Sequence, residues 1–517
     1  MYLTQGLHRM LQRKPESIAT VCGGRRHTVK ELGARVAKLG GALQRLGVRD
    51  GARVGVLAQN ADRYYEVFLG VFWAGGSVNP VNIRWSPAEI AYSLDDCDTQ
   101  ILIVDEMFAG LANDLRARSR SLRTVIFAGD GEAPRDMLCY EAILDAAPPI
   151  ADAHRAGDDL AAVLYTGGTT GFPKGVMLSQ ANLYANALNL IAERCASEDS
   201  VVLVATPMFH VAGVNLTLGV ALAGGRHVFI PAYSPEAVLE AIARERVTLV
   251  FLVPTMIQML LDHPGAGEYD LSSLKCVMYG ASPISEALLE RAMAALPGIE
   301  FAQAYGMTEL ASVATVLQPY YHSAGRAAGK LRSAGRATFF TEVRIVDREG
   351  HEVPRGTVGE IAVRGPGVML GYWNKPAETA SAVRCGWMHT GDGGYMDAEG
   401  FVFVVDRMKD MIVTGGENVY SAEVENALAS HPAVALCAVI GVPDDKWGER
   451  VHAVVLLRPG ARAGEEELRA HCKGLIAGYK APRTVELRDA LPISGAGKIL
   501  KRELRAEHWP RGERGVS

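Results

Sequence analysis

The feature that most constrains the fold is a repeated alternation of helix-like and strand-like segments along the first half of the chain. Residues 29–48 carry apolar side chains at spacings of three and four and end at a glycine, which predicts a helix. Residues 52–60 form a short β-branched run typical of a buried parallel strand, and residues 61–76 return to a helical pattern. Further strands are predicted at residues 99–105, 123–129, 247–254 and 274–282. This alternation favours α/β layers with largely parallel sheets.

The pattern changes twice towards the C-terminus. A chain of 517 residues is too long for one ordinary core, so at least two domains are expected. From residue 341, short strands are broken by glycine and proline, as in a small β-barrel or meander. We therefore predict a large N-terminal domain (residues 1–406) of layered α/β subdomains plus a small β-barrel. A hinge (407–410) and a small, mobile α+β C-terminal domain (411–517) follow.

Charge and cysteine content narrow the class of protein. The net charge of −5 and the pI near 6.3 give no general attraction to nucleic acid. The first residues lack the apolar core of a signal peptide, and the apolar window 201–225 is interrupted by proline and histidine. Eight scattered cysteines predict buried thiols in a reducing compartment. The expectation is a cytoplasmic protein with no transmembrane segment and no nucleic-acid partner.

Residues 165–175, YTGGTTGFPKG, concentrate glycine, threonine and one lysine. Glycines allow the backbone to approach a ligand closely, and successive N–H groups in such a turn form a nest for anions. Lys174 adds a full positive charge, so the stretch predicts a polyphosphate site. A helix expected to begin near Ser179 would direct further N–H groups towards the same site. The pattern is not a Walker A motif, because proline precedes the lysine and glycine follows it.

This stretch resembles the phosphate loop of the adenylate-forming (AMP-binding) superfamily, in its acyl-CoA synthetase or fatty-acid–CoA ligase branch. Further motifs of that family occur in the expected order along essentially the whole chain. They are YGMTE at 305–309, GEIAVRGPGVMLGYW at 359–373, TGD at 390–392, DRMKDMIVTGGENVYSAEVE at 406–425 and LPISGAGKILKREL at 491–504.

The resemblance implies a reaction in two halves. A carboxylate attacks the α-phosphate of ATP, in the presence of Mg²⁺, to give acyl-AMP and pyrophosphate; the thiol of coenzyme A then takes the acyl group and AMP leaves. The carboxylate is already ionised at pH 7, so no general base is required. The C-terminal domain is expected to rotate about Lys409 between the halves, and Gly415 and Gly416 to line the path of CoA. A homodimer is a further expectation.

The resemblance also assigns site residues. Lys498 is expected to contact the α-phosphate and the carboxylate, while Glu309 and the Thr166 hydroxyl hold Mg²⁺. His210 joins them in the predicted catalytic set, beside the carboxylate and without an acid–base role. Asp392 is expected to bind the ribose hydroxyls with help from Arg407. Tyr305 is expected to stack on adenine, opposite Gly280, Ala281 and Ser282. The remaining predicted nucleotide-binding residues are Gly167, Gly168, Thr169, Thr170, Gly171, Lys174, Ala304, Gly306, Met307, Thr308 and Val404.

The acyl pocket is predicted from small and neutral residues near the motifs. Its members are His210, Ala212, Gly213, Asn215, Tyr279, Gly280, Gly306 and Met307. No cation is available there for a second carboxylate, and residues 209–219 offer no acid for an amino group. The predicted substrate is a monocarboxylic acid, either a medium-chain fatty acid or an aromatic acid. Two alternatives remain: an enzyme that loads a separate carrier protein, and a non-catalytic nucleotide-binding relative.

Overall fold

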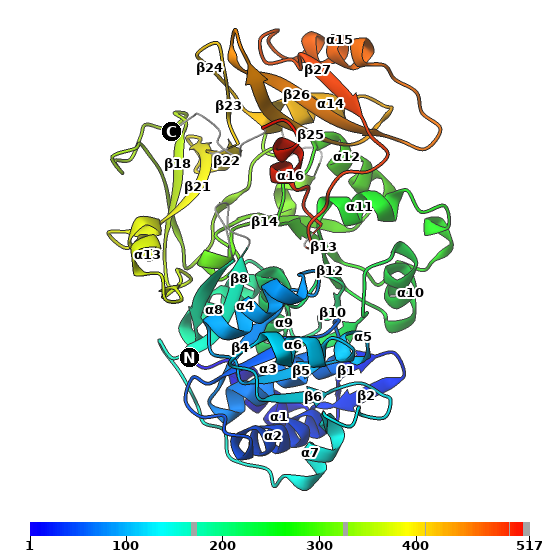
Figure 1. The fold of residues 1–517 in the computed structure, drawn as a ribbon. Coiled ribbons are helices and arrows are strands. Elements are labelled where there is room, and N and C mark those ends of the chain that lie inside the picture. The colour runs from blue at the N-terminus through cyan, green and yellow to red at the C-terminus, as the bar shows by residue number, and fades with distance from the viewer. Residues whose placement is uncertain (167–172, 324–328, 409, 496, 510–517) are drawn as a thin grey trace.

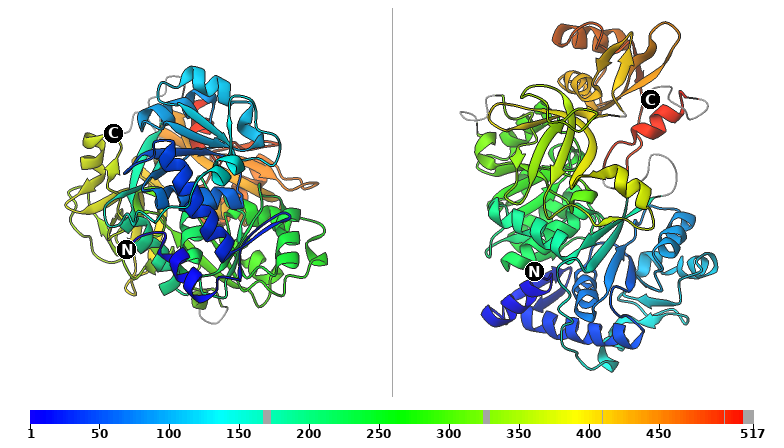
Figure 2. Two further views of the ribbon diagram at one scale, coloured as in Figure 1. Left: turned by 90° about the horizontal axis from the view of Figure 1, so that it is seen from below. Right: turned by 90° about the vertical axis from the view of Figure 1, so that its left-hand side faces the viewer.

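The computed structural model describes residues 1–166, 173–323, 329–408, 410–495 and 497–509. A large part contains three sheets, and a small C-terminal part stands at one end of it, far from α1 (Gln5–Arg13), α2 (Val29–Arg45) and α7 (Tyr140–Ala146) (Figures 1 and 2). None of the helices in the described ranges has both the length and the apolarity that a membrane span requires.

The largest sheet has nine strands and is parallel except at its two edges. In spatial order its strands are β16 (Arg336–Ala337), β15 (Thr315–Leu317), β14 (Glu300–Tyr305), β13 (Cys276–Gly280), β12 (Leu249–Leu252), β10 (Val201–Val204), β11 (Arg226–Phe229), β1 (Ile18–Cys22) and β2 (Arg25–Thr28). The central strands are buried apolar runs, as a sheet covered on both faces requires.

A second, eight-stranded sheet lies in the same part of the molecule. Its order is β19 (Gly371–Tyr372), β9 (Lys174–Ser179), β8 (Leu160–Thr166), β4 (Ser77–Pro80), β3 (Arg53–Leu57), β5 (Ile101–Val104), β6 (Thr124–Phe127) and β7 (Leu138–Cys139). Strands β8, β9 and β19 pair antiparallel, whereas the others are parallel. Glycine-rich residues 167–172 therefore connect two antiparallel neighbours, β8 and β9.

Helices pack between the two large sheets. Helix α8 (Gln180–Ala192) contacts β8 and β9, helix α9 (Val211–Ala223) contacts β10 and β11, and the two helices contact each other. Because α9 is covered on all sides, its sequence is apolar almost throughout. The other helices are α3 (Asp62–Ala74), α4 (Pro87–Asp96), α5 (Glu106–Ala109), α6 (Ala112–Arg118), α10 (Pro235–Glu245), α11 (Pro254–Leu261), α12 (Glu286–Ala295) and α13 (Pro376–Ala382), with 3₁₀ turns η1 (Ala266–Glu268), η2 (Thr308–Leu310) and η3 (Pro319–His322).

The third sheet is antiparallel and corresponds to the predicted β-barrel. It contains β17 (Glu342–Val346), β18 (Gly359–Arg364), β21 (Trp387–Met396), β20 (Val383–Arg384) and β22 (Val402–Arg407). The strand order does not close on itself, so the described residues form a half-barrel.

The C-terminal part has its own sheet and core. The sheet comprises β24 (Glu417–Val419), β23 (Ile412–Thr414), β26 (Gly448–Leu457), β25 (Val434–Asp444) and β27 (Thr484–Leu487), with helices α14 (Ser421–Ala429), α15 (Glu465–Leu475) and α16 (Lys501–Ala506). Its buried core begins at Ile412, whereas the large N-terminal core ends at Val402. The predicted α/β class, with a large N-terminal and a small α+β C-terminal domain, is confirmed. Of the predicted hinge residues, Lys409 lies outside the described ranges.

The predicted elements correspond to observed ones with shorter bounds. The helix expected at 29–48 is α2, which begins with a capping box between Thr28 and Glu31. The strands expected at 247–254 and 274–282 are β12 and β13. All eight cysteines are free thiols, but the prediction that all are buried is wrong, because Cys385 is exposed in the turn between β20 and β21.

Candidate active site

The glycine-rich stretch begins and ends at two paired residues. Thr166, the last residue of β8, is the cross-strand neighbour of Lys174, the first residue of β9. Both ends of the connection are therefore fixed by a sheet, which presents the hydroxyl and the ammonium group side by side. The predicted phosphate-binding residues Gly167, Gly168, Thr169, Thr170 and Gly171 lie outside the described residues.

The expectation that a helix N-terminus supports this loop is wrong. Strand β9 separates the loop from α8, so the helix begins at the far end of a six-residue strand, about 17 Å away. The side chain of Ser179 caps the helix by accepting from the Asn182 N–H, and the Gln180 N–H donates to the carbonyl of Asp159. These first N–H groups are satisfied within the protein.

Glu309 lies in the short turn η2, directly after β14, and is 7% exposed. The Tyr372 hydroxyl donates to its Oε1 at 2.9 Å, and the Lys174 ammonium lies 5.0 Å from the centroid of the Tyr372 ring. Burial raises the pKa of Glu309, while Tyr372, Arg407 and Lys174 oppose that rise. Tyr372 thus links the lysine at the end of the glycine loop to the predicted metal ligand.

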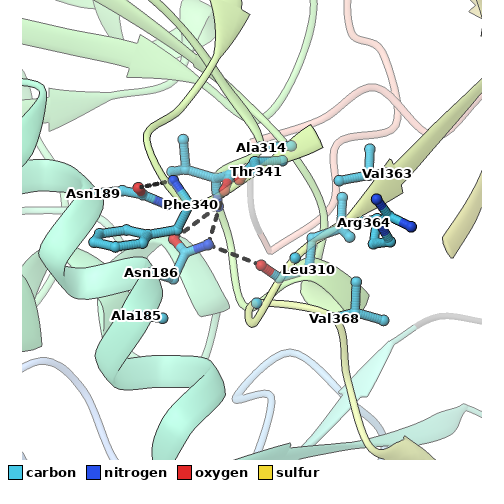
Figure 3. A pocket seen from close by; sticks show the side chains of 13 residues that line it. Ala185, Asn186, Asn189, Leu310, Ala314, Phe340, Thr341, Val363, Arg364 and Val368 are labelled. Atoms are coloured by element: carbon cyan, nitrogen blue, oxygen red, sulfur yellow. Dashed lines mark hydrogen bonds between the residues drawn. The ribbon is translucent and has the colours of Figure 1, made fainter. Parts of the chain in front are cut away.

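The loop after Glu309 is held by an asparagine that sequence reasoning missed. Asn186 on α8 donates from Nδ2 to the carbonyls of Leu310 (2.9 Å) and Val313 (2.8 Å) and accepts from the Val313 N–H (3.0 Å) (Figure 3). All three of its hydrogen bonds are buried. The sequence contains no local signal for this contact, because the partners are more than 120 residues apart.

Asp392 and Arg407 are cross-strand neighbours on β21 and β22. The Nε atom of Arg407 lies 2.6 Å from Oδ1 of Asp392, and the Tyr305 hydroxyl donates to Oδ2 at 2.8 Å. Burial alone would lower the pKa of Arg407, but the combined charges of Asp392, Tyr305, Glu309 and Asp410 outweigh burial and raise it. Three predicted nucleotide-binding residues therefore form one connected group, in which Asp392 is buried and Tyr305 and Arg407 are partly exposed. Val404 lies on β22, opposite Gly394.

Lys498 approaches this group from the C-terminal segment. The carbonyl of Lys498 accepts from the Ser494 N–H at 2.7 Å, which closes a tight turn. The turn is attached to the N-terminal domain, because Thr255 on α11 donates to the Gly497 carbonyl (3.0 Å) and Arg84 to the Ser494 carbonyl (3.3 Å). Burial, reinforced by the charge of Arg407, lowers the pKa of Lys498 to about 8. The ammonium group is still mostly charged at pH 7.

His210 occupies the N-cap position of α9. Its Nε2 atom is buried and has no hydrogen-bond partner among the described residues. Burial, with smaller contributions from the charges of Lys498 and Arg84, lowers its pKa to about 3. The imidazole is therefore neutral near pH 7.

One cavity brings together Lys498, His210 and Tyr305, whereas Lys174, Glu309, Asp392 and Arg407 are not among its lining residues. It has a volume of about 700 Å³ including its open mouth. Side chains from α8, α9, β12, β13, β14, η2 and the C-terminal segment line it, namely Leu190, His210, Val211, Ala212, Asn215, Leu216, Phe251, Met278, Ala281, Ala304, Tyr305, Gly306, Met307, Thr308, Ser312, Val313 and Lys498. The predicted catalytic lysine thus shares a cavity with predicted nucleotide-binding and acyl-pocket residues.

Three predicted pocket residues do not line the cavity. Tyr279 points to the other face of β13, where its hydroxyl bonds to Nε2 of His322 at 2.9 Å. Gly213 packs against Pro207, and Gly280 packs against β14, where an added Cβ would lie 2.1 Å from the Ala304 carbonyl oxygen. Ser282 also lies outside the lining.

The lining residues that the prediction missed include Val211, Leu216, Phe251 and Met278. Strand alternation could have identified Met278, because it points to the face opposite Tyr279. Helical periodicity could have added Val211 and Leu216 to Ala212 and Asn215, since these four positions share one face of α9.

The predicted CoA-path residues lie elsewhere in this conformation. Gly415 and Gly416 form the exposed turn between β23 and β24, and both have positive φ. An added Cβ at Gly415 would lie 2.6 Å from the Trp447 ring. Neither glycine lines the cavity.

Comparisons with known proteins identify the family of the chain. The AMP-binding enzyme family matches residues 7–373, and the AMP-binding enzyme C-terminal domain matches residues 423–498. Feruloyl-CoA synthase of Amycolatopsis sp. is 42% identical over 96% of this chain and 97% of its own. The fatty acid–[acyl-carrier-protein] ligase ScoC of Streptomyces coeruleorubidus is 36% identical over 98% and 96%. The crystal structure of the anthranilate CoA ligase AuaEII in complex with anthranoyl-AMP superposes with a TM-score of 0.92, at 27% identity over 98% and 97%.

The family matches cover both the large part and the C-terminal segment that carries Lys498. The relatives are matched over nearly their whole length. The chain belongs to the AMP-binding enzyme family, in its acyl-CoA synthetase branch.

Proposed function

We propose that this chain is an ATP-dependent acid–CoA ligase that converts a monocarboxylic acid to its acyl-CoA through acyl-AMP, with release of pyrophosphate and AMP. The observation that carries the proposal is the position of Lys498. This lysine comes from the C-terminal segment, yet it lines the same cavity as His210 and Tyr305 of the N-terminal domain. A cation placed between a nucleotide site and an apolar pocket suits the joining of a carboxylate to a phosphate.

In the first half-reaction an ionised carboxylate must approach a polyanion. Lys498 supplies positive charge at the cavity, and Lys174 supplies it at the end of the glycine-rich stretch. The hydrogen-bonded group of Tyr305, Asp392 and Arg407 is proposed to hold the nucleoside, with the Tyr305 ring against adenine and Asp392 at the ribose. A neutral His210 would orient the acid without transferring a proton.

We propose that Thr166 and Glu309 hold Mg²⁺ when ATP is bound. Both offer oxygen atoms, which Mg²⁺ prefers, and it commonly takes its other ligands from phosphates and water. The donor set fits, because Glu309 is a buried carboxylate. Its neighbours do not fully offset the effect of burial, which raises its pKa, and a bound cation would stabilise its charged form. The ion would neutralise phosphate charge, while the hydrogen bond from Tyr372 holds the carboxylate in place.

The second half-reaction requires that Lys498 leave the cavity and that a thiol enter. We propose that the C-terminal domain rotates about Lys409, as a hinge between residues 1–406 and 411–517. The separation of the cores at Val402 and Ile412 supports a rotation that leaves both intact. Gly415 and Gly416, exposed in the present conformation, would then face the CoA path.

The acid is proposed to be aromatic or a medium-chain fatty acid. Apolar side chains make up much of the cavity lining, including Phe251, Met278 and Leu216. The names feruloyl-CoA synthase and anthranilate CoA ligase favour an aromatic acid. The relative named as an acyl-carrier-protein ligase keeps a second candidate, transfer to a carrier protein, open to test.

An acid panel tests the proposal. Purified protein with ATP, Mg²⁺ and CoA should release pyrophosphate and AMP only when a suitable acid is added. CoA and an acyl carrier protein, supplied separately, distinguish the two acceptors. Acid-independent hydrolysis, or no pyrophosphate release with any acid, would contradict the proposed reaction.

Variants separate the two halves. Lys498→Ala should abolish adenylation but retain thioester formation from supplied acyl-AMP. Lys473→Ala, which changes an exposed lysine of the same domain, is the matched control and should retain both. Equal loss of both halves in Lys498→Ala would argue against the rotation.

We also propose a cytoplasmic location, which the eight free cysteines support. An exposed thiol at Cys385 would be oxidised more readily in a secreted protein. The homodimer stays a prediction, and size-exclusion chromatography with light scattering would test it.

A further inference from the structure

One face of α9 forms a wall of the cavity. Val211, Ala212, Asn215 and Leu216 line it, and their spacing of one, four and five residues places them on the same face of the helix. Asn215 is the one polar side chain of that wall. A helix that is otherwise apolar therefore presents a single amide to the ligand space.

The side-chain oxygen of Asn215 is a buried acceptor without a hydrogen-bond donor among the described residues. The residue is 1% exposed, and its Oδ1 atom has no hydrogen-bond partner among the described residues. Two positions further on, Thr217 is equally buried, but its hydroxyl donates to the Gly213 carbonyl at 2.8 Å. The helix can therefore satisfy a buried polar side chain, whereas the oxygen of Asn215, a residue that lines the cavity, is left unsatisfied. A buried acceptor without a partner is unfavourable unless a ligand completes it.

The distance along the helix indicates which part of a substrate would reach this amide. Lys498 and His210 mark the carboxylate end of the cavity, and Asn215 follows His210 by five residues, which is a rise of about 7.5 Å along α9. Other walls of the cavity include the apolar side chains of Phe251 and Met278, which are paired on neighbouring strands. A six-membered ring bearing a substituent opposite the carboxylate has about this length.

We propose that Asn215 is a specificity residue that accepts a hydrogen bond from a hydroxyl group on the distal end of an aromatic acid. The inference rests on the proposed acid–CoA ligase function and narrows its substrate class to hydroxylated aromatic acids. An unsubstituted aromatic or fatty acid would fill the apolar walls but leave the buried amide oxygen unpaired. Sites that pair with a substrate hydroxyl discriminate strongly against the analogue that lacks it.

Matched pairs of acids test the assignment. The pairs are 4-hydroxybenzoate with benzoate and 4-hydroxycinnamate with cinnamate, with octanoate as an aliphatic reference. For the wild-type protein, kcat/KM for adenylation should be at least tenfold higher for the hydroxylated member of one pair. In Asn215→Leu this ratio should fall to about one, mainly through loss of the hydroxylated acid, while the unsubstituted acid is retained. Thr217→Val, which changes a buried polar residue bonded within the same helix, is the matched control and should keep the ratio.

A second measurement does not depend on activity. If Oδ1 of Asn215 has no partner in the ligand-free protein, Asn215→Leu should leave the thermal unfolding midpoint unchanged or raise it. A lowered midpoint, or an equal loss of activity towards both members of each pair, would assign Asn215 a structural role and overturn the inference. So would adenylation of unsubstituted acids as efficiently as of hydroxylated acids by the wild type. That result leaves the ligase function intact, whereas adenylation of no acid at all would refute the ligase function itself.

Discussion

The buried position of Lys498 makes a quantitative prediction about pH. A free lysine has a pKa of 10.5, and burial beside Arg407 lowers the pKa of Lys498 to about 8. The difference corresponds to roughly 3 kcal/mol against the charged form. Because a lysine is charged below its pKa, the ammonium group needed at the α-phosphate is lost as the pH rises through 8. About nine-tenths of the protein carries the charge at pH 7, and about one-tenth carries it at pH 9.

The rate of adenylation should follow this fraction. At low concentrations of both acid and ATP and without CoA, the rate of adenylation reports the protonation state of the free protein, and it should fall about tenfold between pH 7 and pH 9. Continuous detection of pyrophosphate measures the rate, and omission of CoA removes the titration of its thiol from the profile.

An arginine substitution supplies the control. Lys498→Arg keeps a charge that does not titrate in this range, so its lower activity should be independent of pH up to at least 9.5. A wild-type profile that stays level to pH 9.5 would refute the assigned role of the ammonium group. The same decline in both proteins would assign the titration to another residue.

Three further substitutions test the support of the site. Asp392→Asn keeps the size of the side chain but removes the charge beside Arg407. In initial-rate assays KM for ATP should rise at least tenfold, with kcat changed less. An unchanged KM would contradict the nucleotide role. Asn186→Leu removes two donors from buried carbonyls and should lower the stability measured by denaturant unfolding by about 2 kcal/mol, and the protein should require more Mg²⁺ for adenylation. Wild-type stability and Mg²⁺ response in this variant would show that the contact does not position the loop. Thr255→Val removes one hydrogen bond from the turn that carries Lys498. Adenylation should slow about fivefold, for a loss of about 1 kcal/mol, while thioester formation from supplied acyl-AMP stays unchanged. Slowing of both halves would contradict a role specific to adenylation.

Local patterns were sufficient for much of the fold. The helix α2 and the strands β12 and β13 lie within the ranges predicted from apolar spacing, because periodicity records which face of an element is buried. The same patterns were insufficient at the glycine-rich stretch. They do not predict a strand at Lys174–Ser179 and therefore place the helix α8 next to the loop, although β9 lies between them.

The candidate site shows a similar division. Motif order predicts Lys498, Glu309 and Asp392 as site residues, but it does not indicate that Tyr372 donates to Glu309. The sequence predicts Tyr279 as a pocket residue, whereas the pleat of β13 directs it to His322 on the opposite face. Each miss involves a contact between elements that are distant in the sequence.

The amino-acid sequence alone therefore determined the alternation of helices and strands, the chemical groups available for a phosphate and a carboxylate, and the family they indicate. Only the tertiary structure decided which of these groups meet. Lys498 and His210 line the same cavity although nearly 300 residues separate them in the sequence. One reason is that the strands are not ordered in space as they are in the chain. The other is that hydrogen bonds to Thr255 and Arg84 attach the C-terminal turn. Periodicity depends on neighbours within one element, whereas a cavity depends on how the buried faces of several elements pack together.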